Sequence, residues 1–274
     1  MDGPKLDSEG LERYSRQIIM EEIGPDGQDS ILKSKVLVIG AGGLGSPVIQ
    51  YLAAAGVGTI GIVDKDTVEI SNLHRQVIYR VEDVGKQKVE SAREFVSNIN
   101  PNVKVETYHT ELNPDNILSL IKKYDFVIDG TDNFESCFLI NDACTLSKKP
   151  YSYGAVLRFS GRVMTFPARG DSPCYRCLFK TAPPPGTILD CATAGVLGSV
   201  AGVIGSMQAT EAIKNIANVG ELVQGRIIEY NALNMSFEET MIRKNPNCPI
   251  CGKDPTIKNI KDVEYTGACT LKRK

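Results

Sequence analysis

The sequence predicts an α/β fold with a doubly wound, mostly parallel sheet. Short apolar runs alternate with helical segments along most of the chain, a glycine-rich turn joins the first run to the first helix, and the second run ends in an acidic residue. Alternating strands and helices form parallel βαβ crossovers, which pack as one sheet with helices on its faces. With 274 residues and 42% apolar content, the chain is long enough for one large domain of this kind.

The first crossover unit lies within residues 35–64. Residues 35–40 (KVLVIG) form an apolar run closed by glycine, residues 46–55 are typical of a helix, and residues 59–63 (TIGIV) repeat the strand pattern before Asp64. Further helices are predicted at about 86–99, 114–122 and 133–147, with strands near 103–108 and 126–129. Strands at 150–155 and 161–166, a helix at 195–218 and strands at 226–230 and 235–242 complete the series, and we expect the C-terminal strands to be antiparallel.

Three regions follow from this pattern. They are an N-terminal helical arm (1–30), a main domain (31–252) and a C-terminal tail (253–274). Within the main domain, residues 168–191 lose periodicity and contain the run PPPG at 183–186. We therefore expect a long crossing loop at about 168–194 rather than any regular element.

Composition argues against several classes of partner. The 31 basic and 33 acidic residues give a formal charge of −2, which offers no large positive field for nucleic acid or for an anionic membrane. The first ten residues lack the basic, apolar and small-residue regions of a signal peptide. The most apolar stretch, 195–213, is interrupted by polar residues such as Gln208 and Glu211, so it does not resemble a membrane span. We expect a cytoplasmic protein.

A nucleotide site is predicted at the first strand–helix turn. Gly40, Gly42 and Gly45 fit the pattern G-x-G-x-x-G, in which glycines let backbone N–H groups approach phosphate at a helix N-terminus. Asp64 stands at the end of the second strand, about where an acidic residue binds ribose hydroxyls. These residues are compatible with either NAD or ATP, and glycines that serve only close packing are the alternative.

The residues after the second strand favour ATP. Arg75 can bind phosphate oxygens through two nitrogens and Lys88 can act as a point charge, which suits a triphosphate better than a nicotinamide. Asp132 follows the fourth strand at the carboxyl edge of the sheet, where it is well placed to hold Mg²⁺. Taken singly, Arg75 could belong to a surface ion pair, Lys88 could be a solvated helix charge, and Asp132 could be a helix cap before Asn133.

Seven segments together resemble one family. RYSRQ (13–17), GAGGLGS (40–46), GIVDKDTVEISNLHRQ (61–76), VGKQKVESA (84–92), DGTDN (129–133), CYRCL (174–178) and NPNCPICG (245–252) occur in the order seen in MoeB, ThiF and HesA proteins. Those proteins are relatives of the adenylation domain of ubiquitin-activating enzymes. The resemblance covers about residues 11–252 and implies a Rossmann-like α/β fold.

The resemblance also implies roles for individual residues. The set expected to bind nucleotide is Gly40, Gly42, Gly43, Asp64, Asp66, Ser71, Asn72, Arg75, Lys88, Asp132 and Asn133, and the set expected to act in catalysis is Arg16, Arg75, Lys88, Asp132 and Cys191. The members implied to bind phosphate are Asn72, Arg75 and Lys88. Gly43 and Asp64 would contact ATP and its ribose, and Asp132 would coordinate Mg²⁺. Arg16 would reach the nucleotide from the other subunit of a homodimer, although by itself it would pass for an exposed helix arginine.

The implied activity is ATP-dependent adenylation of the C-terminal Gly-Gly carboxylate of a small ubiquitin-like sulfur-carrier protein, with release of pyrophosphate. Such a carboxyl has a reference pKa of about 3.5, so the nucleophile is already ionised and the reaction needs alignment and charge neutralisation more than proton transfer. This agrees with a chain whose two histidines, His74 and His109, form no evident triad. The alternatives are activation of a carboxylate on tRNA, a nicotinamide dehydrogenase and a non-catalytic scaffold.

The pathway that the carrier serves is left open by the sequence. Molybdopterin, thiamin, thiolated tRNA and a cysteine-related product are all compatible with the resemblance. Some relatives carry a C-terminal rhodanese domain that delivers sulfur. Because the chain runs only to Lys274 after Gly252, we expect a separate sulfur-donor protein.

Four of the eight cysteines form two C-x-x-C pairs, Cys174 with Cys177 and Cys248 with Cys251. Two such pairs supply four thiolates, which fill the tetrahedral coordination of Zn²⁺, so a structural zinc site with four cysteine ligands is predicted. A redox pair is less favoured because neither pair follows a thioredoxin-like βαβ start. Cys191 resembles the loop cysteine that some ThiF-type relatives use for a covalent sulfur or thioester link, and an ordinary loop cysteine is an equally good interpretation.

Overall fold

Eight strands form one sheet in this computed structural model, which describes residues 6–167, 171–182 and 194–265. The strands are β1 (Lys35–Ile39), β2 (Thr59–Val63), β3 (Lys104–Tyr108), β4 (Phe126–Asp129), β5 (Tyr151–Leu157), β6 (Ser160–Phe166), β7 (Arg226–Asn231) and β8 (Ser236–Met241). Their order is β3-β2-β1-β4-β5-β6-β7-β8. The pairs from β3 to β5 are parallel and those from β5 to β8 are antiparallel, which confirms the predicted fold class.

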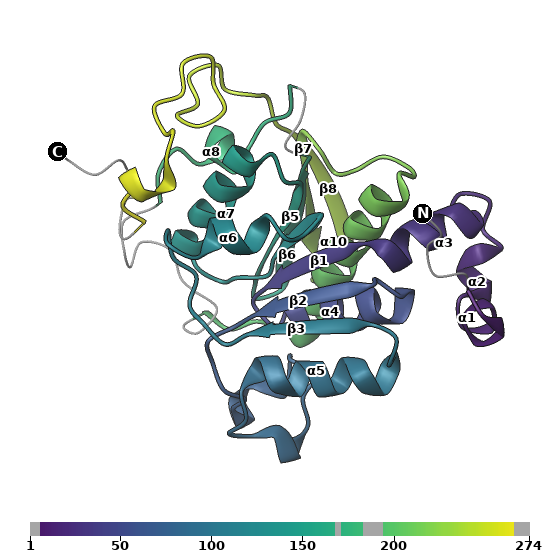
Figure 1. Cartoon of the computed structure of the whole chain (residues 1–274). Coiled ribbons are helices and arrows are strands. Elements are labelled where there is room, and N and C mark those ends of the chain that lie inside the picture. The colour runs from purple at the N-terminus through teal and green to yellow at the C-terminus, as the bar shows by residue number, and fades with distance from the viewer. Residues whose placement is uncertain (1–5, 168–170, 183–193, 266–274) are drawn as a thin grey trace.

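Helices cover both faces of the sheet (Figure 1). The α-helices named here are α1 (Ser8–Arg13), α2 (Ser15–Ile18), α3 (Gly24–Lys33), α4 (Gly45–Ala55), α5 (Lys88–Ile99), α6 (Ile117–Ile121), α7 (Phe134–Ser147), α8 (Tyr175–Leu178) and α10 (Gly198–Ala217). Side chains of α3, α4, α5 and α10 belong to the apolar core on one face, and those of α6, α7 and α8 belong to the core on the other.

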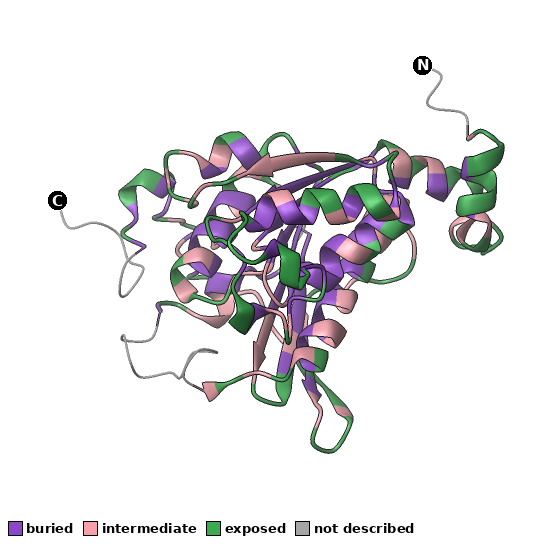
Figure 2. Cartoon of the chain, turned by 90° about the horizontal axis from the view of Figure 1, so that it is seen from below, coloured by how far each residue is buried: buried purple, intermediate pink, exposed green. Residues whose placement is uncertain are grey.

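The central strands are apolar throughout because both of their faces are covered. In β1, Val36 and Val38 point into the core beneath α4, whereas Leu37 and Ile39 point into the core beneath α7. All four residues are at most 3% exposed. Unbroken apolar runs of this kind are the pattern of parallel strands buried on both sides. Figure 2 shows the same division, with buried strands inside and exposed residues on the outer sides of the helices.

The order of strands reverses beside β1. The chain passes from β1 to β2 and β3 on one side, and then returns to place β4 on the other side of β1. In open α/β sheets, ligands bind outside the carboxyl ends of the strands at such a reversal. The ends of β1 and β4 therefore define where a site is expected, and Gly40 and Gly130 follow directly after them.

Two local predictions were wrong in the described part of the chain. Residues 168–191 were expected to hold no regular element, but α8 lies within them, with Asn141 Oδ1 accepting a hydrogen bond from Tyr175 N at 2.9 Å. The last helix begins at Gly198 rather than at 195, because Gly195 has a φ of +81° and Val196 bridges to Arg158. Both differences come from contacts with distant residues.

The segment after Gly252 packs back on the domain as far as Tyr265. Ile257, Ile260, Val263 and Tyr265 are all at most 8% exposed and join the apolar core that α7 covers. Among the described residues, no helix combines the length and the apolarity that crossing a bilayer requires.

Candidate active site

The glycines of the first turn divide into two pairs. Gly40 has a φ of +90°, and a Cβ added to it would lie 2.7 Å from the carbonyl oxygen of Gly130, while a Cβ on Gly45 would lie 2.0 Å from that of Gly40. These two glycines allow close packing of β1, β4 and α4. Gly42 and Gly43 have no such crowding. The N–H groups of Gly42, Gly43 and Leu44 find no hydrogen-bond partner among the described residues, so the turn offers donors to an anion at the start of α4.

Asp64 holds this turn in place from the end of β2. Its Oδ2 accepts a hydrogen bond from Ala41 N at 2.8 Å, and its Oδ1 accepts one from Asp66 N at 2.8 Å. Asp64 is only partly buried, and each carboxylate oxygen has a further lone pair. The carboxylate can therefore both shape the turn and accept from ligand hydroxyls.

The segment after β2 folds over the glycine turn. The side-chain carbons of Arg75 lie 3.6 Å from where a Cβ of Gly43 would be, and its Nη1 donates to Ser71 O at 3.0 Å. Asn72 is buried, and its Oδ1 accepts from Glu69 N at 3.1 Å. The predicted residues Ser71, Asn72 and Arg75 thus lie together beside the turn.

Lys88 is a buried cation rather than a solvated one. It is the first residue of α5, its side chain is 8% exposed, and its Nζ lies 2.9 Å from Asp66 Oδ2. Asp66 has a side chain that is 55% exposed. Since one partner of the pair faces solvent, a phosphate can compete with Asp66 for the ammonium group.

The turn after β4 carries the predicted Mg²⁺ ligand. Asp132 is exposed and makes no hydrogen bond or ion pair to any described residue. The cap of α7 is Asn133, whose side-chain oxygen accepts from Ser136 N at 2.9 Å, so Asp132 is not the helix cap. An unpaired carboxylate at the carboxyl edge of a sheet has the chemistry that Mg²⁺ binding requires.

Asp129 lies beneath this turn and is fully buried. Its Oδ1 accepts from the N and the Oγ1 of Thr131 at 3.1 and 2.7 Å, while its Oδ2 is buried without a partner among the described residues. Burial raises the pKa of Asp129 from 3.8 to about 6, against the lowering effect of the bonds from Thr131. Ionising the Asp129 carboxyl in the folded protein therefore costs free energy.

The free energy of unfolding of the Asp129→Asn variant should increase relative to that of the wild type as the pH rises. The folded protein holds the proton more tightly than the unfolded chain, so the wild type loses stability between about pH 4 and pH 6, by roughly 3 kcal/mol for a shift of this size. The substituted amide keeps an acceptor for Thr131 and carries no charge. Urea unfolding of both proteins at pH 4 and pH 7 measures the difference in stability. A difference that does not change with pH would show that burial does not raise the pKa of Asp129.

Arg16 and Cys191 are not placed at this site by the structure. Arg16 is exposed on α2 and pairs with no described residue, and Cys191 lies outside the described residues. Of the two histidines, His74 contacts Arg75 Nη1 at 2.9 Å, and His109 contacts the carbonyl oxygen of Lys65 at 2.8 Å on the surface.

The two C-x-x-C pairs meet in one cluster. The Sγ atoms of Cys174, Cys177, Cys248 and Cys251 all lie within 4.8 Å of one another, with separations of 3.5 Å for Cys174–Cys248 and 3.4 Å for Cys177–Cys251. A tetrahedral ion with bonds of about 2.3 Å to sulfur separates its ligands by about 3.8 Å. The cluster therefore fits a zinc ion.

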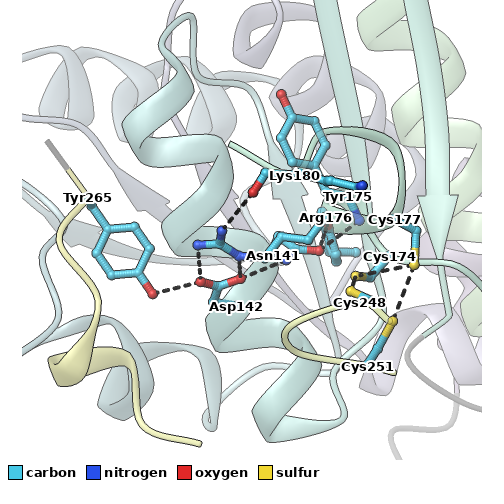
Figure 3. A network of polar contacts seen from close by, with 11 residues as sticks. Asn141, Asp142, Cys174, Tyr175, Arg176, Cys177, Lys180, Cys248, Cys251 and Tyr265 are labelled. Carbon is cyan, nitrogen blue, oxygen red and sulfur yellow. Dashed lines mark hydrogen bonds and ion pairs between the residues drawn. The ribbon is translucent and has the colours of Figure 1, made fainter. Parts of the chain in front are cut away.

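A buried ion pair fastens this cluster to α7 (Figure 3). Arg176, between the first two cysteines, donates through Nε and Nη2 to both oxygens of Asp142 at 2.7 Å, and its guanidinium lies 4.7 Å from the centre of the Phe138 ring. Tyr265 donates to Asp142 Oδ2 at 2.9 Å from the C-terminal segment. Breaking a buried pair of this kind costs about 3–5 kcal/mol, because the remaining charge stays buried.

Sequence reasoning did not single out Arg176, Asp142 or Gln76. The sequence does contain a signal for Arg176 and Asp142. Asp142 is a charged residue within an apolar helix (FLINDACTL), and Arg176 stands between two cysteines predicted to bind metal. Charged residues at such positions need partners when they are buried. Gln76 follows Arg75 and lies against the glycine turn, with 3% exposure. Nothing in its sequence position distinguishes it from a surface glutamine.

This chain is similar to known proteins over most of its length. The model described as ThiF family matches residues 14–250. The chain is 47% identical to SAMP-activating enzyme E1 of Haloferax volcanii, with 97% of each protein covered. It is 46% identical to the sulfur carrier protein adenylyltransferase of Thermus thermophilus, with 96% of this chain and 98% of the relative covered. It is 43% identical to the adenylyltransferase and sulfurtransferase MOCS3 of Culex quinquefasciatus, of which it spans 61%.

Solved structures agree in fold. A crystal structure of E. coli MccB matches 89% of this chain and 75% of its own, with a TM-score of 0.79 and 23% identity. At that identity the match concerns the fold alone.

Proposed function

Because the chain belongs to the ThiF family, we propose that it is an adenylyltransferase that uses ATP to activate the C-terminal carboxylate of a small ubiquitin-like sulfur-carrier protein. The observation that carries the proposal is the pair of relatives, at 46% and 47% identity, that match this chain over 98% and 97% of their own length. One is a sulfur carrier protein adenylyltransferase and the other is an activating enzyme E1. These two relatives match nearly all of this chain, so the matched part includes the glycine turn and the segments around it.

The arrangement of the site supports the proposal. Free backbone donors at Gly42 and Gly43, the guanidinium of Arg75 and the ammonium of Lys88 surround one end of the sheet, where a triphosphate would be neutralised. Asp64 would accept from the ribose hydroxyls. The site therefore supplies positive charge and alignment, and these are what a loose phosphoryl-type transition state requires.

The attacking group needs no base. The C-terminal carboxylate of the carrier is ionised at neutral pH, attacks the α-phosphorus of ATP in line, and forms an acyl-adenylate while pyrophosphate leaves. Asp132 would hold Mg²⁺, which when bound neutralises charge on the phosphate oxygens. Arg75 and Lys88 would hold the departing pyrophosphate. His74 contacts Arg75 and His109 contacts the carbonyl oxygen of Lys65, and neither contact indicates a role in proton transfer.

The N-terminal arm supports a homodimer in which Arg16 acts on the neighbouring chain. Tyr14 is 3% exposed, accepts from Asn100 Nδ2 at 2.8 Å and fills the space beside Gly56 at the end of α4. This fixes the arm at the C-terminal end of α4, while the glycine turn lies at its N-terminal end. With 11 residues, α4 is roughly 16 Å long. The helix that carries Arg16 is thus anchored at the end of α4 that lies farther from its own glycine turn.

An apolar surface over α4 and α10 is suited to the contact between subunits. A groove of about 750 Å³ is lined by both helices, with Tyr51 and Val77 exposed at its rim. At the outer edge of the sheet, two strands beyond β6, β8 also exposes Phe237 and Met241. An apolar groove on the surface of a globular domain commonly marks an interface.

Zinc would serve structure in this enzyme. The four-cysteine cluster has no position for a substrate, and Cys174 and Cys248 are buried beneath the segment that follows Gly252. Its ligands are 74 residues apart in the sequence, so a bound ion would cross-link α8 to the chain after β8. We expect sulfur to come from a separate donor protein.

Pyrophosphate exchange tests the function. With a carrier ending in Gly-Gly, the protein should incorporate labelled pyrophosphate into ATP, and mass spectrometry should detect the carrier acyl-AMP. A carrier with an amidated C-terminus has no nucleophile and should support no exchange. Exchange that is absent with every Gly-Gly carrier, together with binding of NAD, would refute the proposal and favour a dehydrogenase. Exchange driven by tRNA instead would favour activation of a carboxylate on tRNA.

A further inference from the structure

One buried amide beside the glycine turn has no partner. Gln76 is 3% exposed, and its Oε1 is buried without any hydrogen bond to the described residues. Its Nε2 also makes no hydrogen bond to any described residue, and it lies 3.8 Å from where a Cβ of Gly42 would be. An anion cannot satisfy the acceptor Oε1, so the feature that points to a ligand is the donor Nε2, which has no partner among the described residues beside the turn.

Two other buried glutamines of the described chain have a bonded Nε2. Gln28 donates to Ala55 O at 3.0 Å and accepts from Gln17 at 2.6 Å. Gln208 donates to Asp129 O at 2.8 Å and to Ser152 O at 3.1 Å. The Oε1 of Gln208 is also buried without a partner among the described residues, so an unpaired Oε1 does not set Gln76 apart. The difference is the donor: Nε2 of Gln28 and of Gln208 is bonded, whereas Nε2 of Gln76 bonds to nothing in the described protein.

The surroundings of Gln76 indicate what would bond to it. The adjacent N–H groups of Gly42, Gly43 and Leu44 have no partner among the described residues, and the side chain of Arg75 lies beside Gly43. Tyr79 donates to Ala41 O of the same turn at 2.8 Å. A ligand that satisfies several donors at once is an anion with several acceptor oxygens.

We propose that Gln76 is a further nucleotide-binding residue, whose Nε2 donates to a phosphate oxygen held at the glycine turn. The inference rests on the proposed ATP-dependent function and adds a contact to it. In the free protein the side chain of Gln76 is held in place by packing, and its Nε2 gains a hydrogen bond to phosphate when nucleotide binds.

Two substitutions at Gln76 and one control test this inference. Gln76→Leu removes the amide and keeps most of the volume, so the free protein should be at least as stable as the wild type, while the Kd for ATP measured by calorimetry should rise about tenfold or more. Gln76→Glu should weaken binding further because it places a negative charge beside phosphate. Gln28→Leu, which removes a bonded amide, should lower the Tm and leave the Kd for ATP unchanged.

The outcomes separate the inference from the function. A structural role for the amide predicts two results together. Gln76→Leu would lower the Tm as Gln28→Leu does, or would fail to fold, and Gln76→Glu would bind ATP as the wild type does. These two results would show that the inference is wrong. Wild-type protein that binds no ATP would refute the proposed function itself. A weaker Kd for both Gln76 variants, with stability retained, supports the inference.

Discussion

Asp132→Ala should abolish carrier-dependent pyrophosphate exchange, with a loss on the order of 10²- to 10³-fold or more. Asp132 is exposed, pairs with no described residue and stands at the carboxyl edge of β4, so its removal takes away the expected Mg²⁺ ligand without disturbing packing. The Tm and the affinity for the carrier should stay close to those of the wild type. Glu135→Ala is the matched control, because Glu135 is an exposed carboxylate in the first turn of α7 and should be dispensable.

Mixing this variant with a second one tests the dimer at the same time. Arg16→Ala should also be inactive if Arg16 acts on the neighbouring chain. In a dimer formed from one chain of each variant, one of the two sites has both Arg16 and Asp132. Random pairing makes half of the dimers mixed, so exchange should return to roughly a quarter of the wild-type rate after subunits are allowed to re-associate. No recovery in proven mixed dimers would place Arg16 at the site of its own chain. An Arg16→Ala variant that stays active by itself would place Arg16 outside catalysis.

Removing zinc should destabilise the protein strongly. The cluster joins residues that are 74 positions apart, and a cross-link of that length contributes about 4 kcal/mol in the chain-entropy treatment. Since 1 kcal/mol shifts the midpoint by about 2–4 °C for a domain of this size, the Tm should fall by roughly 10 °C on chelation or in Cys251→Ser. Metal analysis and thermal unfolding measure both effects.

A ligand-conserving variant provides the control for the zinc prediction. Cys251 is only partly buried, and Cys251→His keeps a zinc ligand of a kind found in sites with three cysteines and one histidine. It should retain the metal and most of the stability that Cys251→Ser loses. If the purified protein holds no metal and chelators leave its Tm unchanged, the cluster is not a zinc site.

The predictions that succeeded rest on local periodicity. The runs that became β1, β2 and β4 are largely apolar, because parallel strands must be buried on both faces wherever they pair. The turn at Gly40 was recognisable because only glycine tolerates its φ of +90° and the contact with Gly130. The spacing of the four cysteines indicated a metal cluster, since an isolated C-x-x-C pair leaves two coordination positions unfilled.

Element ends were less predictable. The start of the last helix depends on Val196 pairing with Arg158, and α8 lies where the sequence showed no periodicity. The partners in these contacts are far apart in the chain. A local pattern contains no information about which distant group will supply a hydrogen bond.

By itself, the sequence determined the class of fold, the position of the glycine turn and the clustering of the four cysteines, because each depends on the residues of one or two short segments. Only the tertiary structure decided that Lys88 pairs with Asp66, that Arg176 is neutralised by Asp142, and that the amide of Gln76 lies unpaired against the turn in the described protein. These features depend on which buried polar groups meet when the chain folds. The free energy of each buried group is set by its burial and by the group that pairs with it, not by its neighbours in the sequence.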